Sequence, residues 1–171
     1  MTAAHATGGY MLIGVISDTH GLLRPEALAE LVGVQHIIHA GDIGSPEIVP
    51  RLAQIAPITA IRGNVDTHPW SRELPAWEVV TLAGRTVYVI HDLGDLDLDP
   101  VADGFDMVVS GHSHLPKIEM RQGVVYLNPG SAGPRRFRLP ITIATVVLSE
   151  EPLQPMIRPV VEWSRRATSE T

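Results

Sequence analysis

The sequence contains no cysteine, so disulfide bonds and thiolate metal ligands are excluded and any bound metal must be held by oxygen and nitrogen atoms. The lack of cysteine also fits a reducing compartment, and we expect a cytoplasmic protein. No apolar run reaches the roughly 18 residues that a membrane-spanning helix needs. Basic residues are fewer than acidic ones, and the net charge of −6 argues against a surface that binds long nucleic acids.

The chain of 171 residues is long enough for one domain with a hydrophobic core and short for two. Residues 1–9 have neither the basic segment nor the apolar segment of a signal peptide. We find no linker, internal repeat or low-complexity segment. The prediction is therefore a single domain over residues 1–171, with a core of about 11–148 and flexible tails at 1–9 and 165–171.

Short runs rich in β-branched and aliphatic residues predict strands, and several are apolar on both faces, as strands covered on both sides are. The predicted strands are Met11–Ser17, His36–Ala40, Ile58–Arg62, Glu78–Leu82, Thr86–Ile90, Met107–Ser110, Val124–Leu127 and Ile141–Leu148.

Two helical patterns separate the first three strands. The first begins at Pro25 and is closed by Gly33, whereas the second has Ser45 as its expected N-cap and Pro46 as its first residue. The buried face of the first helix is predicted to comprise Ala27, Leu28, Leu31 and Val32. A short helix is also expected within Asp97–Asp103. The β-α-β-α-β order favours a parallel sheet, and the later strands favour a second sheet packed on it, with helices outside.

Six predicted strands run directly into polar residues at their carboxyl ends, the edge where ligands bind in open α/β sheets. These segments are Asp18-Thr19-His20, Gly41-Asp42, Gly63-Asn64-Val65-Asp66, His91-Asp92, Gly111-His112-Ser113-His114 and Asn128-Pro129-Gly130-Ser131. The Asp-x-His and His-x-His pairs would place two side chains on one side of an extended segment. Each segment alone has a plainer interpretation as a turn or helix cap, but their joint occurrence at strand ends favours a metal site.

The predicted metal ligands are Asp18, His20, Asp42, Asn64, His91, His112 and His114. These are too many for one four-coordinate ion. With one bridging carboxylate they suit two ions about 3.5–4 Å apart. Carboxylate, amide and imidazole ligands suit several divalent ions, and we expect Mn²⁺, with Fe, Zn²⁺, Ni²⁺ or Mg²⁺ as alternatives.

Other titratable residues are expected to have structural roles. His39 lies within an apolar strand and is expected in the core or behind the ligands, and Asp66 is expected to support a ligand. The acidic segment with Asp92, Asp95, Asp97, Asp99 and Asp103 lacks the spacing of an EF-hand, which favours a solvated loop.

In this order, the six segments resemble those of the calcineurin-like metallophosphoesterases, in particular the small YfcE-type phosphodiesterases of bacteria and archaea. The resemblance spans roughly residues 11–148. It implies an α/β fold, a four-layer α/β/β/α sandwich of two mixed β-sheets flanked by helices. It also implies that one ion is held by Asp18, His20 and His114, the other by Asn64, His91 and His112, with Asp42 bridging both.

The chain departs from the family pattern at two positions. Val65 stands where many members have a histidine that assists the leaving group, which favours substrates with good leaving groups. The segment after His91 lacks the second histidine common in this branch, and the following helix looks shortened. Contacts of a substrate near Asp92 are therefore left open.

The resulting prediction is a phosphodiesterase that hydrolyses small phosphodiesters by attack of a metal-bridging hydroxide. The residues assigned to catalysis are Asp42, Asn64 and His91, and those assigned to substrate binding are Asn64, Ser131 and Arg135. A phosphomonoesterase is one alternative. Another is a non-catalytic scaffold, like the retromer's phosphoesterase-like subunit, although the intact ligand set favours an enzyme. A homo-oligomer is not excluded by the sequence.

Overall fold

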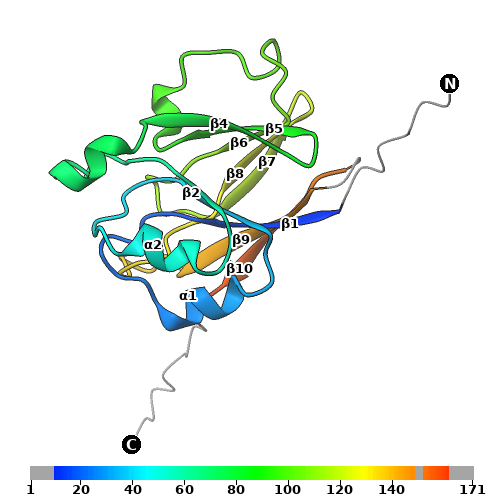
Figure 1. Ribbon diagram of the computed structural model, residues 1–171. Coiled ribbons are helices and arrows are strands. Elements are labelled where there is room, and N and C mark those ends of the chain that lie inside the picture. Colours follow the sequence, from blue (N-terminus) through cyan, green and yellow to red (C-terminus); the bar gives the residue numbers. More distant parts are fainter. Residues whose placement is uncertain (1–9, 149–151, 162–171) are drawn as a thin grey trace, which may run out of the picture.

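The computed structural model describes residues 10–148 and 152–161, so the two predicted tails lie outside the described residues. Two five-stranded sheets, with strand orders β10-β9-β1-β2-β3 and β4-β5-β6-β8-β7, pack face to face (Figure 1). Each sheet contains parallel and antiparallel pairs, which confirms the predicted α/β fold with two mixed sheets. No helix in the described ranges is long and apolar enough to span a bilayer.

The first sheet consists of β1 (Met11–Ile16), β2 (His36–His39), β3 (Ile58–Ala60), β9 (Thr142–Leu148) and β10 (Gln154–Pro159). β1, β2 and β3 run parallel, as the alternating strand and helix pattern predicted. β9 pairs antiparallel with β1, and β10 pairs antiparallel with β9. The helices α1 (Pro25–Glu30) and α2 (Ile48–Ala53) cover the outer face of this sheet (Figure 1).

Both helices are shorter than predicted. α1 ends at Glu30, so Val32 lies in the turn before Gly33 and is exposed rather than buried. α2 begins at Ile48 instead of Pro46, and Glu47, not Ser45, precedes it. Pro50 explains this start. A proline is tolerated within the first turn, where amide hydrogens have no partner, but further along it would break a hydrogen bond and clash with the preceding turn.

The second sheet consists of β4 (Trp77–Leu82), β5 (Arg85–Ile90), β6 (Met107–Val109), β7 (Lys117–Arg121) and β8 (Val124–Asn128). β5, β6 and β8 run parallel, while β4 and β7 form antiparallel edges. A short 3₁₀ helix, η1 (Pro69–Glu73), precedes β4.

A loop, rather than an α-helix, covers the outer face of the second sheet in the described chain. It contains the 3₁₀ helix η2 (Leu93–Asp95), and its side chains pack on a small cluster that includes Tyr88. The helix expected within Asp97–Asp103 is wrong. Asp99 caps a single turn, and Gly104, with φ of 73°, ends it before an α-helix can form. The fourth layer of the sandwich is thus reduced to a loop.

A continuous core separates the two sheets, and it fixes the register of the strands that lead to the polar loops. Alternate residues of β1, such as Ile13 and Val15, face the second sheet, whereas Ile16 faces the helices. These three side chains are fully buried, and each removes apolar surface worth about 1.5–3 kcal/mol from water. The residue at which each strand ends is therefore set by packing.

Candidate metal centre

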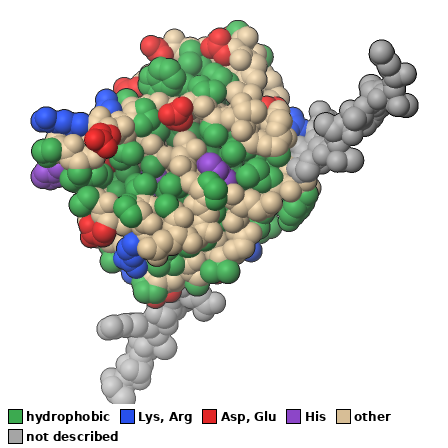
Figure 2. All heavy atoms as spheres, in the orientation of Figure 1, with side chains coloured by type: hydrophobic (Ala, Val, Ile, Leu, Met, Phe, Trp, Pro, Cys, Tyr) green, Lys and Arg blue, Asp and Glu red, His purple; other side chains and the backbone are tan. Residues whose placement is uncertain are grey.

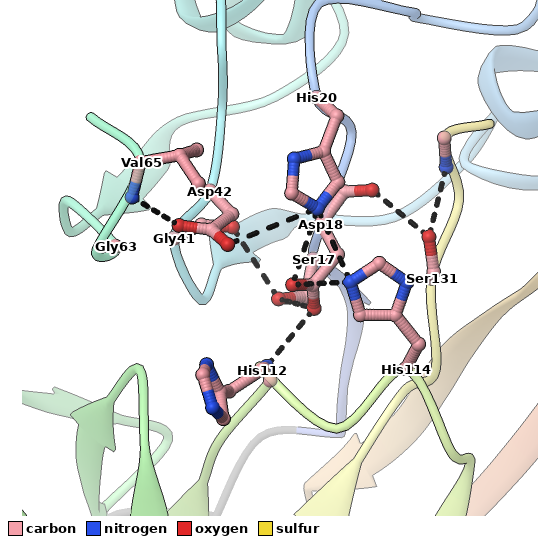
Figure 3. A network of polar contacts seen from close by, with 12 residues as sticks. Ser17, Asp18, His20, Gly41, Asp42, Gly63, Val65, His112, His114 and Ser131 are labelled. Atoms are coloured by element: carbon pink, nitrogen blue, oxygen red, sulfur yellow. Dashed lines mark hydrogen bonds and ion pairs between the residues drawn. The ribbon is translucent and has the colours of Figure 1, made fainter. Parts of the chain in front are cut away.

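The loops after β1, β2, β3, β5 and β6 meet at one end of the two sheets and bring all seven predicted ligands together. Figure 3 shows Asp18, His20, Asp42, His112 and His114 at this place. Backbone hydrogen bonds join neighbouring loops. The amide of Asp18 donates to Gly41 (3.0 Å), and that of Gly111 donates to His91 (2.9 Å). These bonds tie the loops within each sheet, and the amide of His112, which donates to Oδ2 of Asp18 (3.1 Å), ties the two sheets to one another.

One group of ligand atoms surrounds Asp18, whose side chain is fully buried. Its Oδ1 lies 3.3 Å from Nε2 of His114 and 3.8 Å from Nε2 of His20. The two Nε2 atoms are 3.1 Å apart, so both rings point toward the same carboxylate oxygen, as Figure 3 shows. This geometry could hold a metal ion between the three side chains.

A second group lies around Asp42 and His91. Oδ2 of Asp42 is 3.3 Å from Nε2 of His91 and 3.8 Å from Nε2 of His20, so Asp42 lies between the two groups. Oδ1 of Asn64 is 3.1 Å from both Nε2 of His91 and Nδ1 of His112. These atoms would extend the metal-holding set of Asp18, Asp42 and His91.

Five of the seven predicted ligands have positive φ angles, between 45° and 67°. They are Asp18, His20, Asp42, His112 and His114. The expectation that Asp-x-His and His-x-His lie on extended segments is therefore wrong. The pairs converge because the backbone turns left-handed at each ligand. Such conformations cost non-glycine residues energy and gather at functional sites.

Gly63 and Gly111 are needed for close approach rather than for a special backbone angle. A methyl group at Gly63 would collide with the carboxylate of Asp42, and one at Gly111 would collide with Ser17 and the carboxylate of Asp18. The missing side chains let two neighbouring loops pass directly behind the acidic ligands.

The electrostatics of Asp18 fit a bound cation. Burial raises the pKa of its carboxyl to about 6, although the hydroxyl of Ser17 donates to Oδ2 and opposes the shift. Oδ1 has no hydrogen-bond partner among the described residues. A buried carboxylate oxygen without a donor is costly, and a divalent cation would satisfy it.

The histidines beside Asp18 are in the form that binds metals. Burial lowers the pKa of His114 to about 4 and also lowers that of His20, and the positive charge of Arg136 acts in the same direction on both. Neutral imidazole is the metal-binding form. Two rings that face each other with neutral nitrogens therefore suit a shared ion better than a shared proton.

His91 has its ring orientation fixed from behind. Its Nδ1 donates to the carbonyl oxygen of Ala40 (2.7 Å), which leaves Nε2 with its lone pair directed into the site. Burial lowers the pKa of His91, but hydrogen bonds to Asp42 and Ala40 outweigh burial and raise it overall. In the protonated ring Nε2 carries a proton toward Asp42, and a cation at Nε2 would take the place of that proton.

Two other buried residues support the loops without facing the site. Asp66 accepts hydrogen bonds from the amides of Ile43, Gly44 and Gly63, which is the supporting role expected for it. His39 is fully buried between Thr19 and the amide of Gly41, and burial lowers its pKa to about 3. It lies behind the ligands, as expected.

The two other residues predicted to contact substrate, Ser131 and Arg135, both bond to the protein itself. The hydroxyl of Ser131 is buried and bonded to the carbonyl of Asp18 and the amide of Gly133, so it holds the loop after β8 against the first ligand. Arg135 is exposed and bonds to the carbonyl of Leu139 (3.4 Å). Arg136, which sequence reasoning missed, is the arginine whose charge acts on the histidine pair.

Residues 11–151 match the family model described as the calcineurin-like phosphoesterase superfamily domain. A protein named probable metallophosphoesterase, from Methanothermobacter thermautotrophicus, is 40% identical over 133 residues, which cover 71% of this chain and 77% of the relative. Phosphodiesterase YfcE of Escherichia coli K12 is 31% identical over 140 residues, 67% of this chain and 76% of the relative. The structure of Vacuolar Protein Sorting 29 from Cryptosporidium parvum matches with a TM-score of 0.70 at 18% identity, covering 87% of this chain and 97% of that one, which shows the fold alone.

Proposed function

Because the chain belongs to the calcineurin-like phosphoesterase superfamily, we propose that it is a metal-dependent phosphodiesterase that hydrolyses small phosphodiesters. The family predicted from the motifs is thereby confirmed. The observation that carries the proposal is the buried Oδ1 of Asp18, which faces two neutral imidazoles and has no hydrogen-bond partner among the described residues. The proposed centre would hold two divalent cations, preferably Mn²⁺.

The proposed division of ligands follows the two groups of atoms. Asp18, His20 and His114 would hold one ion, Asn64, His91 and His112 the other, with Asp42 between them. When bound, the ions would activate water and neutralise charge on the phosphoryl oxygens.

Side chains of the protein would complete the phosphate site. Oδ1 of Asn64 faces His91 and His112, so its amide NH₂ is left to donate to a phosphoryl oxygen. The charge of Arg136 lies within electrostatic range of the histidine pair and would attract the same anion. Arg136 is therefore preferred over Arg135 as the arginine that binds substrate.

The preference for diesters rests on Val65. This residue follows Asn64, is 39% exposed and has no proton to give a leaving group, while its amide donates to Asp42. A site with weak leaving-group assistance favours esters whose leaving group departs easily. The net charge of −6 favours a small substrate over a long polyanion, and the face shown in Figure 2 carries few Lys or Arg side chains.

Hydrolysis of bis(4-nitrophenyl) phosphate and of 4-nitrophenyl phosphate tests the proposal directly, since both release the same chromophore. We expect faster turnover of the diester, loss of activity on chelation, and better recovery with Mn²⁺ than with Mg²⁺. A tenfold preference for the monoester, which is about 1.4 kcal/mol in the transition state, would contradict the substrate class. Full activity after verified metal removal would contradict the mechanism.

A non-catalytic scaffold is the second candidate, since the fold also matches Vacuolar Protein Sorting 29. It predicts metal binding without turnover of any phosphate ester. The complete set of ligand side chains at one site favours the enzyme. The oligomeric state and the cytoplasmic location stay predictions.

A further inference from the structure

A hollow of about 310 Å³ opens beside the metal centre, on the side of Asn64, His91 and His112. This volume is within the range of about 300–1,000 Å³ that is typical of small-molecule sites. Its other walls come from the start of β4, the outer face of β5 and the loop after β5. The hydrolysis proposed above assigns no role to these walls.

A column of three aromatic rings stands at this hollow. Trp77 lines it and is 56% exposed. The indole stacks on Tyr88, with ring centroids 5.8 Å apart and planes at 26°, and Tyr88 stacks on Phe105 at 5.3 Å and 21°. Tyr88 is only 3% exposed, so the column is anchored in the structure and Trp77 is its outermost ring. A half-exposed indole held in this way is a platform for a planar ligand.

The platform lies close to the proposed reacting centre. In the β4–β5 pairing Trp77 is opposite Ile90, the residue that directly precedes His91. A phosphate at the metal centre and a ring on Trp77 can therefore belong to one small molecule. Their shared hollow joins the two positions without an intervening strand.

The charge of the hollow restricts the ligand. Three carboxylates line it, from Asp92, Asp95 and Asp97, against one guanidinium, that of Arg62, which already donates to the carbonyl of Leu74. A second phosphate would be repelled by these carboxylates. A neutral ring with N–H donors would instead be attracted, because ionised carboxylates only accept hydrogen bonds.

We propose that this hollow binds the nucleobase of a nucleotide ester, stacked on Trp77, while the phosphate of the same ester lies at the metal centre. The inference rests on the proposed function and narrows its substrate class to phosphodiesters of nucleosides. Asp95 and Asp97 offer acceptors to the N–H groups of the base.

A comparison of inhibition by adenosine 5′-monophosphate and by ribose 5-phosphate distinguishes the contribution of the base to binding from that of the phosphate. With bis(4-nitrophenyl) phosphate as substrate, we expect adenosine monophosphate to inhibit at a concentration at least about fivefold lower than ribose 5-phosphate does. This factor is the smaller end of what one base–aromatic stack contributes. Trp77→Ala should remove this advantage and leave inhibition by ribose 5-phosphate unchanged. Trp77→Phe, which keeps a ring, should retain most of it.

Val79→Ala is the matched control, because Val79 lies two residues along the same strand, is 38% exposed and does not line the hollow. It should leave both inhibition constants unchanged. If the two inhibitors act equally on the wild-type enzyme, or if Trp77→Ala weakens both alike, the base site is refuted while phosphodiester hydrolysis stands.

Quenching of indole fluorescence gives a second measurement that needs no turnover. Adenosine monophosphate should quench wild-type protein more strongly than ribose 5-phosphate does, and Trp77→Phe should abolish the difference. If no ester is hydrolysed with any metal but this difference is present, the proposed hydrolysis fails and the base site is supported. Equal quenching by both ligands in wild-type protein would overturn the base site.

Discussion

The carboxylate of Asp66 joins two loops of the candidate metal centre, and its replacement gives the sharpest test of how those loops are held. Oδ2 accepts from the amides of Ile43 (3.0 Å) and Gly63 (2.8 Å), and Oδ1 accepts from the amide of Gly44 (2.9 Å). The residue is 4% exposed, so water cannot replace a lost acceptor. The two loops carry one predicted ligand each, immediately before Ile43 and after Gly63.

Asp66→Asn keeps the size of the side chain and removes one acceptor. The amide oxygen can retain the two bonds made by Oδ2, which leaves the new NH₂ facing the amide of Gly44. One hydrogen bond to a charged group is then lost, and a buried donor is left without a partner. Together these changes should lower the free energy of unfolding by about 2–4 kcal/mol. That is a large part of the roughly 5–15 kcal/mol of a typical domain.

Urea denaturation of chelated protein measures this change, with Asp103→Asn as the control. Asp103 is exposed, so the control removes the same charge from a side chain in contact with solvent. Metal affinity, measured by titration, should also fall about 10–100-fold in Asp66→Asn, because the loops that hold the ligands are no longer joined. A loss of stability no larger than that of Asp103→Asn would refute the reasoning.

Three further predictions concern single residues. Gly63→Ala should lower metal affinity by about tenfold or more in a titration, because the added methyl group collides with the carboxylate of Asp42. Burial holds the pKa of His39 at about 3, below its ordinary value, so folding favours the neutral ring. The free energy of unfolding of the wild type should therefore fall as pH drops below about 6.5, and His39 alone contributes up to about 1.4 kcal/mol per pH unit. His39→Gln, whose amide can make both hydrogen bonds of the ring, should lose this share of the slope and keep the shares of His20 and His114 in urea denaturation of chelated protein between pH 7.5 and 5.5. A slope equal to that of the wild type would contradict the assignment. Arg136→Gln should raise the KM for a diester more than Arg135→Gln does, since the charge of Arg136 acts on the histidine pair; equal effects in steady-state assays would contradict this.

The position of the candidate metal centre could be predicted because its residues follow apolar strands directly. Asp18 comes two residues after β1, and His91 comes directly after β5. The carboxyl ends of parallel strands meet at one edge of a sheet, so neighbouring loops are brought together whatever their own conformation. The prediction that the ligand pairs lie on extended segments was wrong. The prediction that their side chains converge was right, because the position of each loop depends on strand packing.

The two strands that the sequence analysis missed are both at sheet edges. β7 (Lys117–Arg121) has every side chain at least partly exposed, so it lacks the buried face that marks a strand. β10 contains Pro155 and Pro159, which weaken a strand pattern and are tolerated at an edge because one side makes no ladder bonds. Hydrophobic periodicity appears where one face of a strand is buried, and these two edge strands have too little buried surface to show it.

The sequence indicates the reaction more readily than the substrate, for a similar reason. Predicted metal ligands such as His91 are specified locally, each by one strand end, so a sequence alone can indicate the chemistry. The proposed base site depends on Trp77 reaching Tyr88 across the β4–β5 pairing, and on Asp97 being brought to the same hollow by the loop after β5. In the sequence Asp97 was expected only to be solvated, because nothing local connects it to Trp77, which lies 20 residues earlier. The proposed base site is therefore built from side chains that only the register of the second sheet brings together.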